Sequence, residues 1–171
     1  PIYSGKKSSG RKSDGGTVGV GPESLGLSFT KDVKVYVQPG NANAVLDSIK
    51  KATKSIHVTM YLLTDNDIED ALVEASKTKE VKVVLNGVFP EGGNANTSAY
   101  NKLKAAKVPV VWSSTTYAYT HSKCVIIDGS AAWIMTMNLT ESSAATNREF
   151  LAYDTDASDV AIAEEVFQAD F

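Results

Sequence analysis

The sequence predicts an α/β domain in which a mixed β-sheet is sandwiched between helices. Strand-like and helix-like segments alternate along most of the chain, and a hairpin signal follows around Asp128-Gly129. The chain has 171 residues, 43% of them hydrophobic and 22% charged, which is enough for one domain with a sizeable core. We expect that domain over 29–171 and a flexible, basic, Gly- and Ser-rich tail over 1–28.

The first third of the domain shows a strand, a helix and a second strand. A strand at 34–37 is stopped by Pro39-Gly40, and apolar residues at helical spacing then predict a helix that begins near Asn41. Residues 55–63 alternate between apolar and polar side chains, as in a strand with one buried face. The polar face carries His57, Thr59 and Tyr61. A histidine in such a place is more often structural than catalytic, although His57 or Tyr61 could line a pocket.

Polar residues at 64–67 predict the start of the next helix, which has an apolar stripe. Its first turn is acidic. The acidic side chains belong to Asp65, Asp67, Glu69 and Asp70. They could hold a cation, but acidic residues at a helix N-terminus are expected from the macrodipole alone, and we prefer that interpretation.

In the middle of the domain, the sequence predicts a buried strand at 81–85 and a helix at 99–107. The loop at 86–97 between them is expected to lie over a sheet edge and shape access to a site. A strand at 108–112 follows. Its proline, Pro109, suits an edge strand, because proline cannot donate to the hydrogen-bond ladder.

A hairpin is predicted between His121 and Asn138, with its turn at Asp128-Gly129. Side chains alternate along a strand, so His121 and Lys123 point to the same face. With a two-residue loop, Thr136 and Asn138 share that face, whereas a three-residue loop would place them on the other one. After the hairpin we expect a loop over 139–146, a strand over 148–153 and a closing helix over 157–171.

The polar groups of this hairpin suit phosphoryl transfer. A neutral imidazole can attack phosphorus, and histidine titrates close enough to neutrality to serve as acid or base. The Lys123 ammonium can bind a phosphate oxygen, and Thr136 and Asn138 can donate hydrogen bonds to the same group. Glu149 supplies a carboxylate that could hold the second imidazole nitrogen of His121.

These residues resemble a known family. His121-x-Lys123-x4-Asp128 resembles the HKD motif of the phospholipase D superfamily. The segment 135–138 stands where that family usually has Gly-Ser-x-Asn, with Met135 in place of the glycine, and 147–149 resembles the downstream Asn-x-Glu. The resemblance covers 31–171 and implies the phospholipase D/nuclease-like fold.

The resemblance also implies a role for each matched residue. His121 would be the nucleophile or the general acid, with Glu149 as its partner, and Lys123 would bind phosphate. Thr136 and Asn138 would be further phosphate ligands. Asp128 belongs to the catalytic motif, although in the family it is mainly a structural residue near the turn.

Family members bring two HKD motifs together, and this sequence has one. The resemblance therefore implies a partner, either an identical chain or the second half of a longer two-motif protein. The activity it implies is that of a metal-independent phosphodiesterase acting through a phosphohistidine, with no cofactor. Phospholipid is the first substrate candidate and DNA or RNA the second. From a different class, the chain could be a non-catalytic half or binding module.

Composition limits which bonds, metal sites, partners and membrane segments the chain can have. Cys124 is the only cysteine, which excludes an internal disulfide, and two histidines argue against a multi-histidine metal site. The net charge is −3, divided between +3 in residues 1–20 and −6 in the remainder, which argues mildly against unspecific binding to duplex nucleic acid. No apolar run approaches the length of a membrane span. The compartment stays open between secreted and cytoplasmic.

Overall fold

The computed structural model describes residues 32–41 and 43–171, and the predicted tail at 1–28 lies outside them. Seven strands form one mixed sheet in the order β1-β7-β6-β5-β2-β3-β4. The strands are β1 (Val33–Gln38), β2 (Ser55–Met60), β3 (Glu80–Leu85), β4 (Val110–Trp112), β5 (Lys123–Ile127), β6 (Ala131–Met135) and β7 (Glu149–Asp154). The helices are α1 (Ala44–Lys51), α2 (Asn66–Ser76), α3 (Thr97–Ala105), α4 (Glu141–Ala145) and α5 (Ala157–Asp170).

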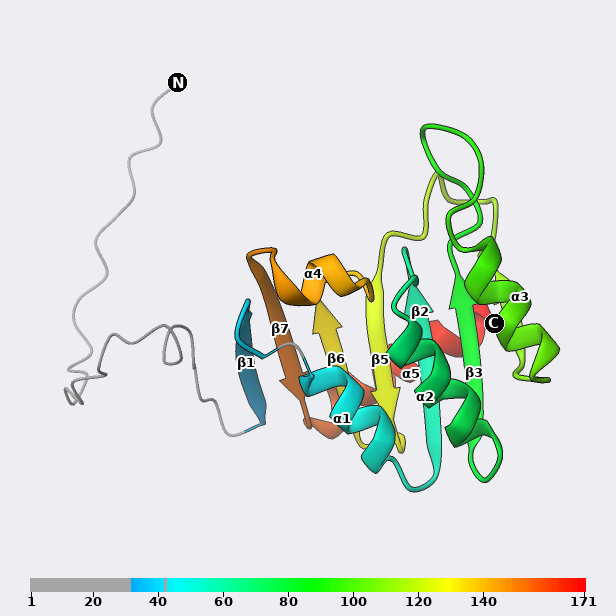
Figure 1. The fold of residues 1–171 in the computed structure, drawn as a ribbon. Helices are drawn as coiled ribbons and strands as arrows, with labels where there is room; N and C mark the ends of the chain where they lie inside the picture. Colours follow the sequence, from blue (N-terminus) through cyan, green and yellow to red (C-terminus); the bar gives the residue numbers. More distant parts are fainter. Residues whose placement is uncertain (1–31, 42) are drawn as a thin grey trace, which may run out of the picture.

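Helices cover both faces of this sheet, which confirms the predicted fold class. Figure 1 shows α1 to α4 in front of the sheet and α5 behind it. The large core lies on the front face, and a smaller cluster joins α5 to the rear face through Val160 and Phe167. Among the described residues, no helix is both long and apolar enough to cross a bilayer.

The connections explain the mixed sheet. Parallel pairing joins β2, β3 and β4, because α2 and α3 carry the chain back across the front face between them. The remaining neighbours are antiparallel. Asp65 caps α2, since its side chain accepts hydrogen bonds from the backbone N–H groups of Asp67 and Ile68. The acidic first turn of α2 therefore has a structural explanation, as preferred from the sequence.

Two elements differ from the prediction. A short helix, α4, occupies part of the segment expected to be a loop, and the Thr140 hydroxyl caps it by accepting from the backbone N–H of Ser143 at 3.0 Å. Strand β2 ends at Met60 rather than at residue 63. Leu63 instead pairs with Leu139 in an isolated parallel bridge, which draws the chain after β6 across the start of β5.

The hairpin has the predicted turn but not the two-residue loop. Asp128 and Gly129 both have positive φ, +56° and +62°, as an Asp-Gly turn requires. Ser130 is an extra residue, however, because Ile127 pairs with Ala131. Three residues separate the strands, so strand alternation puts Thr136 on the face opposite Lys123. The expectation of one shared sheet face was therefore wrong for Thr136.

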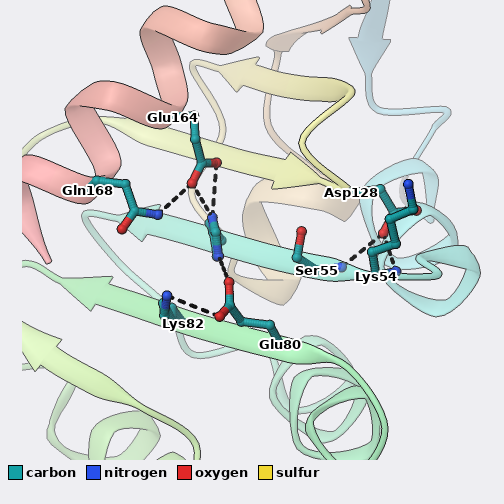
Figure 2. Close-up of polar contacts among 8 residues, drawn as sticks. Lys54, Ser55, Glu80, Lys82, Asp128, Glu164 and Gln168 are labelled. Atoms are coloured by element: carbon teal, nitrogen blue, oxygen red, sulfur yellow. Dashed lines mark hydrogen bonds and ion pairs between the residues drawn. The ribbon is translucent and has the colours of Figure 1, made fainter.

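Asp128 anchors this turn to the loop before β2. Its carboxylate accepts hydrogen bonds from the backbone N–H groups of Thr53, Lys54 and Ser55 and from the Thr53 hydroxyl, at 2.6–3.0 Å. Figure 2 shows Asp128 directed toward Lys54 and Ser55. Burial alone would raise the pKa of Asp128, but these hydrogen bonds outweigh it and lower the pKa to about 2.

We expect Asp128→Ala to lower the free energy of unfolding by about 1–3 kcal/mol, because three backbone N–H groups lose their acceptor. The pKa of Asp128 is depressed in the folded state, so its contribution is complete above pH 4 and disappears as the pH falls toward 2. Denaturation of wild type and variant between pH 2 and 7 measures this difference. Asp47→Ala, at an exposed position on α1, is the control. A variant with wild-type stability at pH 7 would contradict the anchoring role.

Candidate active site

The predicted site residues, Asp128 excepted, gather at one end of the sheet. Strand β5 begins there with Lys123, opposite Met60 at the end of β2. Strand β6 ends there and β7 begins there with Glu149. Because these neighbours are antiparallel, the start of one strand meets the end of the next, at the upper end of the sheet in Figure 1.

His121 and Lys123 form the centre of the site. The Lys123 Nζ lies 3.1 Å from both ring nitrogens of His121 and donates a hydrogen bond to the His121 carbonyl oxygen at 2.8 Å. An ammonium equally distant from both nitrogens leaves neither of them committed to a strong hydrogen bond. Lys123 itself is 7% exposed, while His121 is open to solvent. The imidazole can therefore be approached by a substrate while the ammonium is held in place below it.

Tyr61 supports both side chains. Its ring centroid lies 4.5 Å from that of His121, with the planes at 60°, and the Lys123 ammonium lies 5.1 Å from the Tyr61 ring centroid. This distance suits a cation–π contact. Tyr61 was predicted only as a pocket-lining residue, and it proves to contact both HKD side chains.

The environment lowers both pKa values, which suits a neutral His121 nucleophile but acts against the positive charge of Lys123. Burial, and secondarily the positive charge of Lys123, lowers the pKa of His121, so the imidazole is neutral at pH 7. Burial also lowers the pKa of Lys123, although the Glu149 carboxylate acts in the opposite direction. A neutral nucleophile beside a positive charge is the arrangement that attack on a phosphodiester anion requires.

Glu149 is near the centre but does not hold His121. Its carboxylate accepts hydrogen bonds from the Thr136 hydroxyl at 2.5 Å and from the Asn147 amide at 3.3 Å. Among the described residues, no hydrogen bond joins Glu149 to His121. The predicted tautomer-fixing contact is therefore absent from this arrangement, and the carboxylate acts on Lys123 through its charge.

Asn138 lies in the segment that crosses from β6 to Leu63. Its neighbour Leu139 donates its backbone N–H to the Leu62 carbonyl oxygen at 3.1 Å, which fixes that crossing. The Asn138 Oδ1 is buried without a hydrogen-bond partner, one of two such side-chain atoms in the described part of the chain. Buried polar atoms normally have partners. A phosphate oxygen needs a hydrogen-bond donor, so any contact with phosphate at this position would have to come from the Asn138 Nδ2 and not from this oxygen.

Two other candidate site residues, Asp128 and His57, lie away from this end of the sheet. Asp128, which the motif groups with His121 and Lys123, stands at the opposite end of β5, roughly 15 Å away for a five-residue strand. Its assignment to the catalytic group is corrected, because it anchors the turn. The three residues of the motif therefore lie at two ends of β5, with His121 and Lys123 in the candidate site and Asp128 in the turn.

His57 is on the rear face of the sheet, beneath α5. Its Nε2 lies 2.8 Å from the Glu80 carboxylate and its Nδ1 2.7 Å from that of Glu164, while the ring stacks on Phe167 with centroids 4.6 Å apart. Figure 2 shows Glu80 and Glu164 directed toward each other from β3 and α5. The hydrogen bond from His57, followed by that from Lys82, lowers the pKa of Glu80. His57 therefore ties α5 to the sheet, as the structural interpretation expects.

Sequence reasoning missed two asparagines that shape the site. Asn86 and Asn96 are both buried. The Asn86 Oδ1 accepts from the backbone N–H of Thr120, immediately before His121, at 3.0 Å. Asn96 accepts from the Leu63 N–H and donates to the carbonyl oxygens of Tyr61 and Asn86. Both occur in a Gly- and Asn-rich stretch, and nothing in the pattern marks them as buried.

Within the described residues, no group of three or more His, Cys, Asp or Glu side chains is arranged to hold a metal ion. The Cys124 thiol is half-buried, and burial raises its pKa to about 11. A thiol with this pKa is protonated at neutral pH, so Cys124 does not offer a second nucleophile.

A comparison with protein families matches most of the chain to one family. The family model described as "Cardiolipin synthase, PLD-like domain" matches residues 45–171. A search of curated protein sequences gave no significant match.

Solved structures with the same fold come from several bacteria. Nuc, a phospholipase D family member from Salmonella typhimurium, is 26% identical, with a TM-score of 0.72 over 81% of this chain and 92% of Nuc. NucT from Helicobacter pylori is 19% identical, with a TM-score of 0.67 over 81% of this chain and 94% of NucT. Phosphatidylserine synthase from Haemophilus influenzae Rd KW20 is 13% identical, with a TM-score of 0.62 over 80% of this chain and 37% of that one. The last two comparisons show likeness of fold alone.

Proposed function

The chain belongs to the family of phospholipase D-like domains, and from this premise we propose that it is a metal-independent phosphodiesterase working through a phosphohistidine on His121. The observation that carries the proposal is the His121–Lys123 pair, an accessible imidazole with an ammonium 3.1 Å from its ring nitrogens. Superfamily members are generally phosphodiesterases, and this pair supplies a nucleophile and a phosphate ligand.

The proposed reaction has two displacements. A ring nitrogen of His121 attacks phosphorus, the N–P bond forms, and the bond to the leaving oxygen breaks. Water or an alcohol then attacks the phosphohistidine, which gives hydrolysis or transfer and frees the imidazole. Lys123 stabilises the negative charge on the non-bridging oxygens in both transition states. Asn138 lies at the same end of the sheet and is proposed as a further phosphate ligand. Thr136 could join it only by giving up its hydrogen bond to Glu149 and turning from the opposite face of the sheet.

We expect turnover of a chromogenic phosphodiester to persist in excess EDTA, because the proposed chemistry uses only protein side chains. The measurement compares initial rates with and without chelator after dialysis. Loss of activity on chelation that added Zn²⁺ or Mg²⁺ restores would contradict the metal-independent mechanism. No turnover with any phosphodiester would favour the alternative of a binding module.

Phospholipid is the first proposed substrate and nucleic acid the second. The charge of −6 over residues 21–171 disfavours a polyanion. The observation that favours a nuclease is the group of aromatic rings beside His121, because bases stack on Tyr and Phe side chains. Parallel assays on phosphatidylcholine and on single-stranded DNA separate the two substrate classes.

The mechanism also requires a second acid. One imidazole cannot attack phosphorus and at the same moment protonate an oxygen that leaves on the opposite side. His57 is on the other face of the sheet and engaged by two carboxylates, so it cannot supply that proton. We propose that a second HKD motif does so, from an identical chain or from a second half of a longer protein.

An exposed apolar surface on the rear face supports such a partner. Ile134 on β6 and Val166 of α5 line one cavity on this face. Phe150 on the neighbouring strand β7 and Ile162 of α5 are also exposed, and all four side chains are 49–60% exposed. Thr136, which pairs with the Phe150 position, extends this surface to the site. Large apolar side chains exposed on one face are typical of interaction surfaces.

Mixing tests whether the partner is an identical chain. If two copies share each site, adding an excess of inactive His121→Asn chain to wild type should lower the specific activity, because mixed dimers lose one imidazole. The control is an added chain that carries both His121→Asn and Phe150→Glu. The charge of the new glutamate should prevent this chain from entering dimers, so it should not lower the specific activity. Full turnover by a strictly monomeric sample would contradict the shared site.

A further inference from the structure

Two loops rise beyond the end of the sheet next to the candidate site. They are residues 86–96, between β3 and α3, and residues 113–120, between β4 and His121; Figure 1 shows both above the sheet. Asn86 holds them together. Its Oδ1 accepts from the Thr120 N–H at 3.0 Å, its Nδ2 donates to the Val88 carbonyl oxygen at 2.5 Å, and the Gly87 N–H reaches the Ser113 hydroxyl at 3.4 Å. These hydrogen bonds join the two loops into one edge beside the candidate site.

Apolar and aromatic side chains project from this edge. Tyr117 is 60% exposed, Val88 46% and Tyr119 42%. Phe89 packs with its ring centroid 5.1 Å from that of Tyr61, and the ring of Tyr119 lies 6.5 Å from the same centroid. We call Val88, Phe89, Tyr117 and Tyr119 the rim. Since Tyr61 also contacts His121, the rim is continuous with the candidate site.

The rim carries almost no charge. Residues 113–122 contain no Asp, Glu, Lys or Arg, and residues 86–96 contain only Glu91. A surface that follows a nucleic-acid backbone needs cations, and so does one that binds anionic lipid. Exposed tyrosines with a neighbouring aliphatic side chain instead suit the boundary between headgroups and acyl chains, where the ring is buried and the hydroxyl stays hydrated.

We propose that the rim docks the protein onto aggregated zwitterionic phospholipid and so brings His121 to the headgroup phosphates. This inference rests on the proposed function, whose substrate class it specifies. The rim side chains enter the outer part of the bilayer, and His121, set back behind Tyr61, comes to rest at the level of the headgroups. The acidic body contributes no attraction to an anionic surface, so the apolar contact selects uncharged lipid.

The test uses the full chain and phosphatidylcholine vesicles. The double variant Val88→Ser/Tyr117→Ser removes two exposed apolar side chains that have no part in the chemistry. The control Val88→Leu/Tyr117→Phe keeps both apolar. We expect the serine variant to lose roughly tenfold or more in vesicle binding by co-sedimentation, and a similar factor in turnover of vesicular lipid, while the control behaves as wild type. Turnover of a soluble phosphodiester should stay within about twofold of wild type for all three, because the transition-state contacts are unchanged.

Failure of this inference can be told apart from failure of the proposed function. Absence of vesicle binding by wild type, or equal binding by the serine variant, overturns docking by the rim. Loss of single-stranded DNA binding in the serine variant, without vesicle binding by wild type, would assign the rim to base stacking and also overturn it. Inactivity of wild type on every soluble phosphodiester would remove the proposed function, whereas the vesicle comparison would still test the rim by binding alone.

Discussion

His121→Asn is expected to abolish phosphodiester turnover while leaving the thermal midpoint nearly unchanged. Asparagine keeps a polar side chain in an exposed position but has no nitrogen that can form and release an N–P bond. The contact with the Tyr61 ring is the main packing that the variant loses. Initial rates and thermal unfolding of the purified variant measure the two effects separately.

His57→Asn is the matched control, because it removes the other histidine from the opposite face of the sheet. It breaks the links to Glu80 and Glu164 and the stacking on Phe167. We expect a lower thermal midpoint with the activity per folded molecule retained. Wild-type activity in the His121 variant would remove the central assignment, and complete inactivity of a folded His57 variant would show that the two histidines had been assigned the wrong roles.

Lys123→Ala is expected to lower kcat by on the order of a hundredfold or more, through loss of charge stabilisation in the transition state. It should also move the acid limb of the pH–rate profile. The positive charge of Lys123 is the second cause, after burial, of the lowered pKa of His121. Removing that charge raises the pKa, so the imidazole becomes neutral, and active, only at a higher pH.

Rates measured between pH 4 and 9 test both effects of this substitution. Lys102→Ala is the control, since Lys102 forms ion pairs with Glu69 and Asp70 away from the site. Its removal should leave kcat and the acid limb unchanged. A Lys123 variant with a reduced rate but an unshifted acid limb would show that Lys123 does not act on His121 through its charge.

The sequence predicted the elements that local pattern controls. The strand around Val83 and the helix capped by Asp65 are set by apolar period and capping chemistry, and both occur where expected. Pro109 marked β4 as an edge strand correctly, and β4 is the last strand of the sheet. His121 and Lys123 lie together as predicted, although β5 begins only at Lys123 and the contact is made by the Lys123 ammonium folding back to the His121 carbonyl oxygen and ring.

The register of the hairpin depended on a single residue and was not predictable. Both a two-residue and a three-residue loop are compatible with the Asp-Gly signal, and the extra Ser130 reverses the face of Thr136. The Asp128 carboxylate helps to select this geometry by binding the loop at Thr53 and Ser55, a contact between segments about 75 residues apart in sequence.

The partners of Glu149 and Asn86 also come from distant elements. The Thr136 hydroxyl donates a hydrogen bond to Glu149 because β6 and β7 are neighbours. The same hydroxyl accepts a hydrogen bond from the Phe150 N–H at 3.0 Å. Motif spacing gives the position of Glu149 in the chain but not the direction of its carboxylate. For Asn86, burial follows from the packing of two loops against each other, which no local pattern records.

Direct detection of the phosphohistidine tests the central claim most sharply. Wild-type protein is mixed with a soluble phosphodiester, quenched in alkali within the first turnovers and digested for mass spectrometry. The mechanism predicts a phosphoryl adduct on the peptide that contains His121, absent from the His121→Asn protein and lost on acid treatment. Steady turnover with no adduct on His121, or with an adduct on another residue, would contradict it.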